Sequence, residues 1–150
     1  MARRFQFPLE TLLRVRALRE REAKRKVAAQ RAEIARLDRQ NRQTAEEISR
    51  QQAELLAGQQ HGRLDPSALQ RGRAWIAHLR RTITLRQAQR VALEAQWQQL
   101  QAAWLAARTQ LRIIEKLRER RWAAYRHDHS RSEQAAADEL AQQLHGYEVI

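Results

Sequence analysis

Apolar residues recur along the second half of the chain at alternating spacings of three and four positions. The recurrent positions form one ladder, and eleven of its fourteen places hold apolar residues. The ladder consists of Leu69, Gly72, Ile76, Leu79, Ile83, Arg86, Arg90, Leu93, Trp97, Leu100, Trp104, Ala107, Leu111 and Ile114. Because this spacing averages 3.5 residues, it places a narrow stripe along one side of an α-helix, and such a stripe is buried only against another helix. The pattern therefore predicts a coiled coil.

A weaker stripe with the same spacing runs through the first half of the chain. It consists of Leu13, Val27, Ile34, Ile48 and Leu55, with Leu9, Ala23 and Leu37 on the alternate positions. Gly58, Gly62 and Pro66 interrupt the pattern between the two stripes, where Asp65 is a good helix N-cap and Pro66 suits the first helical position. We therefore predict an all-α fold, a single domain over residues 1–150 that forms a long antiparallel two-helix coiled-coil hairpin. Its helices should span about 8–57 and about 66–145, with a turn at about 58–65.

The position of the turn predicts which residues face each other. With the turn centred near residue 61, the numbers of facing residues add to about 123, give or take one helical turn, so that Pro8 faces Glu115 and Arg90 faces Glu33. The same register places Thr82 opposite Asn41. Polar residues in a coiled-coil seam fix its register at a cost in stability. The alternative is that Arg86 and Arg90 only extend their charged heads into water.

Positive charge is concentrated in two segments that such a hairpin brings together. The formal net charge of the chain is +12. Residues 1–31 contribute +7 and residues 116–131 contribute +4, whereas residues 132–150 hold four acids and no Lys or Arg. The hairpin should therefore carry a strongly basic end, which attracts acidic proteins, anionic lipid or nucleic acid.

The residues that most catalytic or ligand sites need are missing or scattered. The chain has no Cys, and its four Gly residues do not form a phosphate-binding loop. His127 and His129 lie on different faces of a helix, so a metal site there is disfavoured. We expect no catalytic activity, no cofactor and no metal. The N-terminus lacks the apolar stretch of a secretory signal, and no apolar run is long enough to cross a bilayer, which favours a cytoplasmic protein.

The four tryptophans divide into two groups. Trp97 and Trp104 are on the apolar ladder and should be substantially buried. Trp75 and Trp122 are one position off the ladder, where they either anchor a protein partner or cover the edge of the seam. Trp122 and Tyr125 also follow the basic run Arg118-Glu119-Arg120-Arg121, a combination that admits nucleic acid as an alternative partner.

Two segments resemble a known family. The opening residues, Phe5-Gln6-Phe7-Pro8-Leu9-Glu10-Thr11-Leu12-Leu13-Arg14-Val15-Arg16, resemble the start of the flagellar export protein FliJ. The segment Ile114-Glu115-Lys116-Leu117-Arg118-Glu119-Arg120-Arg121 resembles a late FliJ segment, as do Tyr125, Glu133 and the pair Asp138-Glu139 after it. The order and spacing of these motifs cover nearly the whole chain. Stalk proteins of the YscO type in virulence-type secretion are similar, which leaves flagellar and virulence-type export both open.

The resemblance implies a non-enzymatic, coiled-coil stalk of the flagellar type III protein export apparatus, needed for flagellum assembly and motility. Family members link the export ATPase FliI to the export gate FlhA and aid the cycling of export chaperones. Carried over to this chain, the ATPase-binding residues are Arg14, Arg16, Arg19, Arg21, Lys116, Arg118, Arg120, Arg121 and Tyr125. The gate-binding residues are Trp75, Ile76 and Leu79, although Arg80, Arg81 and Arg86 make this stretch unusually basic for the family.

The resemblance also implies where the protein acts and what it does not bind. It places the protein in the cytoplasm, peripheral on the inner membrane at the flagellar base, with no small-molecule substrate. The alternative function is a basic, nucleic-acid-binding coiled coil. A salt titration with mixed-sequence DNA separates the two functions, because a nucleic-acid-binding protein should bind with micromolar or better affinity at physiological salt and should weaken steeply as salt rises.

Overall fold

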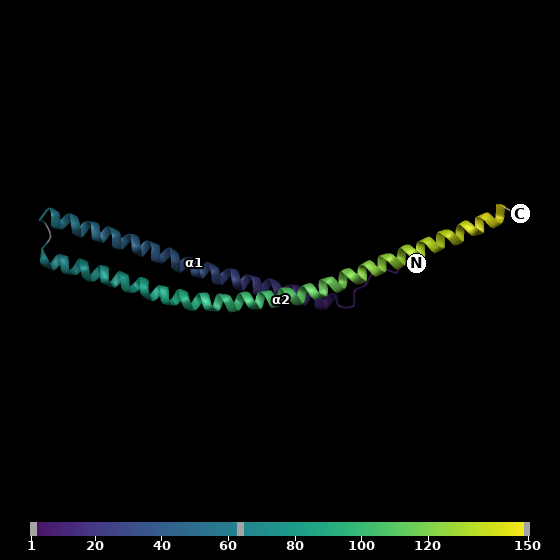
Figure 1. Ribbon diagram of the computed structural model, residues 1–150, viewed down its shortest axis with the longest axis horizontal. Helices are drawn as coiled ribbons and strands as arrows, with labels where there is room; N and C mark the ends of the chain where they lie inside the picture. Colours follow the sequence, from purple (N-terminus) through teal and green to yellow (C-terminus); the bar gives the residue numbers. More distant parts are fainter. Residues whose placement is uncertain (1–2, 63–64, 149–150) are drawn as a thin grey trace. The chain divides into compact units, whose positions relative to one another are not determined.

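Two long helices make up nearly all of the structure. The computed structural model describes residues 3–62 and 65–148, and these contain α1 (Glu10–Gln60), α2 (Pro66–Glu148) and no strand (Figure 1). The two helices pack against each other, which confirms the predicted all-α hairpin.

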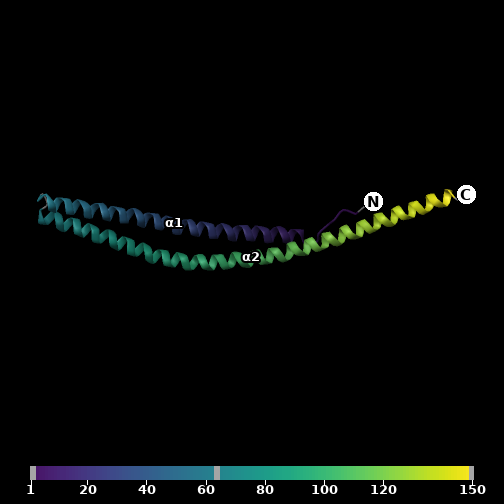
Figure 2. The same ribbon diagram turned by 45° about the horizontal axis from the view of Figure 1, so that its top comes forward.

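The chain divides into a turn unit, residues 22–104, and a terminal unit, residues 1–21 with 105–150. Each unit holds a piece of both helices, as the ribbon colours show in Figure 2.

A left-handed glycine follows the end of α1, and a side-chain cap fixes the start of α2. α1 continues through Gly58 to Gln60, and Gly62 follows with a φ of 65°, a left-handed conformation that suits glycine. The Asp65 carboxylate accepts a hydrogen bond from the backbone N–H of Ala68 at 2.6 Å, so Asp65 caps α2 as predicted. Residues 63–64 of the predicted turn lie outside the described residues. A single helical glycine costs only about 1 kcal/mol, which the packing of α1 on α2 offsets at Gly58.

The longer α1 changes the register of the hairpin. The turn is centred near residue 63, midway between the two helices, and not near residue 61. The numbers of facing residues therefore add to about 127, as for Leu55 and Gly72, whose absent Cβ would lie 2.6 Å from a Leu55 methyl carbon. The observed register thus differs from the predicted centre by about one helical turn, the margin that the prediction allowed.

Particular pairings change with the register. Arg90 does not pair with Glu33, which binds Arg36 of its own helix. The Thr82 hydroxyl donates to the His78 carbonyl at 3.1 Å and does not bond to Asn41. In the terminal unit, Glu10 pairs with Arg118, so Pro8 faces a position about one turn beyond Glu115.

The core is narrow and follows the predicted ladder. Every ladder position from Leu69 to Ile114 is buried or partly buried, as are all eight positions of the stripe predicted in the first half of the chain. In the turn unit, Ile48, Ile76 and Leu79 form a buried cluster with Leu55 and Ile83 packed against it. Trp97 and Trp104 are on the seam but only partly buried, because a two-helix seam stays open on both flanks.

Polar side chains cross the seam at the middle of the turn unit. Arg86 Nη1 donates to Thr44 Oγ1 at 2.8 Å and to the Gln40 carbonyl at 3.4 Å. Arg90 Nε donates to Asp38 Oδ1 at 2.8 Å, and its Nη1 donates to Glu94 at 3.0 Å. The hydrogen bond and charge of Asp38 raise the pKa of Arg90 above its usual range, and the charge of Glu94 adds to the effect. The two arginines therefore bind α1, in accord with the first of the two interpretations of the seam.

Candidate protein-binding surfaces

The N-terminal segment lies along α2 within the terminal unit. Phe5 packs edge-on against Trp122, with ring centroids 5.0 Å apart, and its centroid is 5.4 Å from that of Tyr125. The Tyr125 hydroxyl donates to the Arg3 carbonyl, and Phe7 is buried. Pro8 and Leu9 then turn the chain into α1, where the N–H of Glu10 bonds to the Phe7 carbonyl at 3.1 Å. α1 therefore begins two residues later than predicted, and residues 3–7 continue its contact with α2.

Trp122 thus covers the edge of the packed seam, although 43% of its surface remains exposed. The flank position alone did not distinguish this contact from a free partner anchor. The sequence feature that could have predicted this contact is the pair Phe5 and Phe7 ahead of Pro8. Two aromatic side chains just before a helix start need an apolar surface to pack against.

The predicted ATPase-binding residues all belong to the terminal unit, but three of them make internal contacts. Arg118 Nε pairs with Glu10 at 3.2 Å, and its guanidinium carbon lies 5.8 Å from the centroid of the Phe5 ring. Arg16 lies on the seam and donates to the Gln110 side chain, while Tyr125 holds the N-terminal segment. These side chains hold the N-terminal part of the chain against α2 within the terminal unit, and they also add charge.

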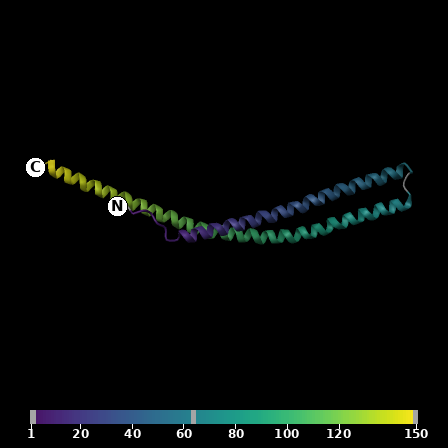
Figure 3. The same ribbon diagram turned by 180° about the vertical axis from the view of Figure 1, so that it is seen from behind.

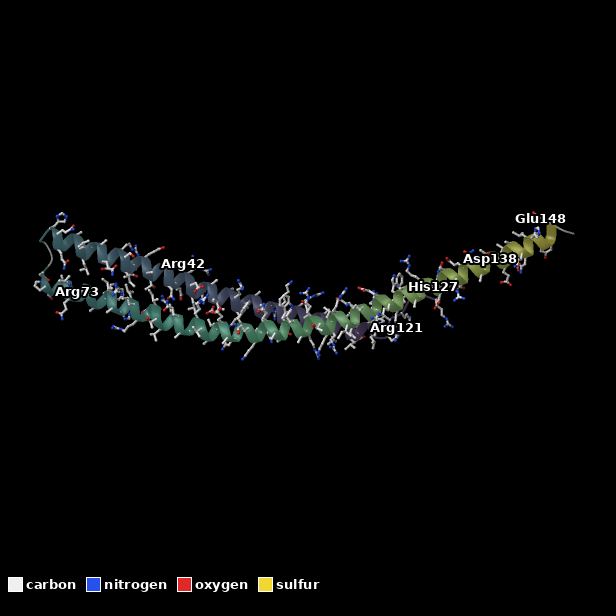
Figure 4. All side chains as sticks on the ribbon, viewed as in Figure 1. Arg42, Arg73, Arg121, His127, Asp138 and Glu148 are labelled. Atoms are coloured by element: carbon white, nitrogen blue, oxygen red, sulfur yellow. The ribbon has the colours of Figure 1, made fainter. Side chains whose placement is uncertain are left out.

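The remaining predicted cations are exposed and face solvent. They come from both helices, and Figure 4 labels Arg121 among them. They are Arg14, Arg19, Arg21, Lys116, Arg120 and Arg121. None of these six side chains forms an ion pair with another of the described residues, so their charge is available to a partner. We call these six residues the basic surface.

The predicted gate-binding residues differ in exposure. Trp75 is 43% exposed and stacks on His78, with ring centroids 5.4 Å apart. Ile76 and Leu79 are only 7% and 6% exposed, because they form the hairpin core with Ile48. The surface available at this place is therefore Trp75 with His78, and Ile76 and Leu79 support it from inside.

The described residues offer little for chemistry or for membrane insertion. They contain no group of three or more His, Cys, Asp or Glu side chains placed to hold a metal ion. Among the same residues, no helix is long and apolar enough to span a bilayer. The surfaces that remain are charged or aromatic patches on paired helices, an arrangement typical of a protein that works by binding other proteins.

These features define a class, the coiled-coil proteins that present binding surfaces on a helical hairpin. The family model for the flagellar FliJ protein matches residues 5–148, and the chain belongs to this family. It is accordingly a non-enzymatic stalk component of the flagellar type III export apparatus. The assignment supports export over the nucleic-acid alternative. No curated protein and no solved structure shows a significant match to the sequence.

Proposed function

We propose that the basic surface of the terminal unit binds the export ATPase FliI. The observation that carries this proposal is the gathering of exposed cations from two segments about one hundred residues apart in sequence. The ion pair between Glu10 and Arg118 and the contact between Phe5 and Trp122 hold those segments together. The surface has no catalytic group, so it acts by promoting the assembly and turnover of the ATPase.

Charge suits this task because complementary potentials speed association and select the partner. Arg14, Arg19 and Arg21 project from α1, and Lys116, Arg120 and Arg121 project from α2. A partner with an acidic surface can contact both helices at once. Binding through these exposed groups should weaken as salt rises, because screening acts most strongly on charges in water.

The test is charge reversal followed by measurement of ATP hydrolysis by purified FliI. A variant with Arg14, Arg19, Arg120 and Arg121 changed to Glu should lose at least about tenfold in affinity for the ATPase, and with it the stimulation of ATP hydrolysis. The control reverses four exposed arginines of the turn unit, Arg39, Arg42, Arg50 and Arg73, and so changes the net charge equally. Equal stimulation by the two variants, with helicity intact by circular dichroism, would remove the basic surface from the proposed function.

A second surface is proposed for the export gate FlhA. It consists of Trp75 and His78, backed by Ile76 and Leu79, and the resemblance to the family motivates it. Trp75→Ala should weaken gate binding by about tenfold, as expected for an aromatic anchor, without changing helicity. Leu85→Ala, at a residue 66% exposed on the same helix, is the control. Unchanged gate affinity in Trp75→Ala would contradict this assignment.

The proposal also covers chaperones and location. We infer that the protein aids the cycling of export chaperones and works in the cytoplasm, peripherally bound at the inner membrane beneath the flagellum. Family membership supports both inferences. Fluorescent fusions should form spots at flagellar bases that disappear when the gate protein is deleted, and uniform membrane labelling would contradict the placement.

A further inference from the structure

The C-terminal part of α2 presents an apolar face that no other described part of the chain covers. In the ribbon views the yellow end of α2 runs without a second described helix beside it (Figures 1 and 3). Leu140, Leu144 and Tyr147 are 59%, 60% and 79% exposed. Their spacings of four and three place them on one side of the helix. We call residues 132–148 the acidic tail, because they hold four acids and no Lys or Arg.

A second exposed apolar stripe lies earlier on the same helix, on the side away from the seam. Leu105 and Ile113 are 51% and 60% exposed and line a shallow groove of about 390 Å³. The other residues of this groove are Arg108, Thr109, Arg112 and Lys116. We call these six residues the outer stripe. Arg112 is partly neutralised by Glu115 and Glu119, whereas Arg108 and Lys116 have no ion-pair partner among the described residues.

The outer stripe and the acidic tail have opposite charges and matching spacings. Leu140 follows Leu105 by five heptads, and Leu144 follows Thr109 by five heptads. In a left-handed coiled coil, residues separated by whole heptads share one face. A second helix can therefore contact both patches of α2 along a single line.

We propose that this face of α2 binds a second copy of the chain, with the acidic tail of each copy on the outer stripe of the other. The two α2 helices run antiparallel about a two-fold axis near residue 126. Such an interface is isologous, because the same patches serve on both copies. This inference does not rest on the proposed ATPase binding, although both surfaces use Lys116 and Arg120.

The antiparallel pairing matches apolar with apolar and acid with base. Leu105 faces Tyr147, Thr109 faces Leu144, and Ile113 faces Leu140. Lys116 then lies beside Asp138, and Arg120 lies beside Glu133. Figure 4 labels Asp138 and Glu148 along the tail. The pairs near the axis contribute little, because Ala123 faces Ser130 and the two copies of Arg126 turn to solvent.

This pairing should give a weak dimer, because each patch has only three exposed apolar or hydroxyl side chains. The dimer should also be sensitive to salt, because ion pairs hold the rest of the interface. Sedimentation equilibrium of the full chain at up to about 100 µM and low salt should detect the dimer, since small transient interfaces dissociate in the micromolar range. Raising the salt to about 0.5 M should dissociate it by screening. A monomer under all these conditions would overturn the proposal.

Charge exchange provides the specific test. Lys116→Glu with Arg120→Glu should weaken self-association by roughly tenfold, because facing charges become alike. Adding Asp138→Lys and Glu133→Lys to the same chain should restore it. The matched control, Arg39→Glu with Arg42→Glu, makes the same change in net charge within the turn unit and should leave self-association unchanged. Failure of the restoring variant, with helicity retained, would refute the pairing.

The apolar part of the pairing has its own control. Leu144→Ser should weaken self-association, whereas Leu85→Ser, at an exposed leucine outside both patches, should not. Equal weakening by both substitutions would show that association is a general effect of exposed leucines, and would overturn the assigned face.

Discussion

Arg86 is a charged residue at a position where a coiled coil normally holds an apolar side chain. Its guanidinium reaches across the seam to the Thr44 hydroxyl and the Gln40 carbonyl. A partly buried polar contact of this kind selects one register more than it adds stability. Asn41 on the same seam has a buried side-chain oxygen without a hydrogen-bond partner, a further cost of polar residues at this place.

We predict that Arg86→Leu raises the free energy of unfolding by about 1 kcal/mol, because leucine fits the seam without desolvating a charge. Urea unfolding followed by circular dichroism measures the change. The matched substitution Arg81→Leu, at an exposed position of the same helix, should alter stability by less than about 0.5 kcal/mol. Destabilisation by Arg86→Leu would show that the bond to Thr44 has a net stabilising effect.

The buried cluster of the turn unit supports a second residue-scale prediction. Ile76 is 7% exposed and packs with Ile48 and Leu79. Ile76→Ala should cost about 2 to 4 kcal/mol, because a cavity remains in a core that is only one stripe wide. A shift of the thermal midpoint no larger than that of Leu85→Ala would mean that the seam is on another face.

At the scale of the elements, the N-terminal segment is held by aromatic contacts and not by a helix of its own. We predict that Phe5→Ala releases residues 3–7 from α2, since the ring contacts with Trp122 and Tyr125 are lost. Amide hydrogen exchange should accelerate at residues 5–10 and stay unchanged in the turn unit. Gln6→Ala, at an exposed neighbour, is the control. Unchanged exchange in Phe5→Ala would show that the segment is held by other contacts.

The elements also show how far the sequence alone determines the fold. The α2 ladder was predicted in full, because its apolar residues are nearly continuous. The α1 seam looked weak because polar side chains fill the rest of the ladder. These partly or fully buried positions are Arg16, Glu20, Gln30, Asn41, Thr44 and Gln51. The observed register lies about one turn from the predicted centre, because Gly58 predicts a break in the helix, whereas α1 continues through it to Gln60. At the candidate sites, the sequence located the basic residues. It could not show that Arg16 and Arg118 make internal contacts while their neighbours are exposed.

At the scale of the whole molecule, family membership and surface charge point to the same role. The chain is a non-catalytic stalk component of the flagellar export apparatus. Its formal charge of +12 is compatible with a role in binding acidic partners, while the acidic tail opposes that charge locally. The proposed dimer would place a second chain against Lys116 and Arg120, so self-association and ATPase binding would compete for these two side chains.

The proposed function requires the export ATPase to contact the basic surface of the terminal unit. Site-specific photo-crosslinking in cells that assemble flagella tests it most directly. A photoreactive residue in place of Leu18, which is 62% exposed among the α1 arginines, should capture the ATPase. The same residue in place of Leu56, 56% exposed in the turn unit, should not. Capture from Leu56 and not from Leu18 would contradict ATPase binding at the basic surface.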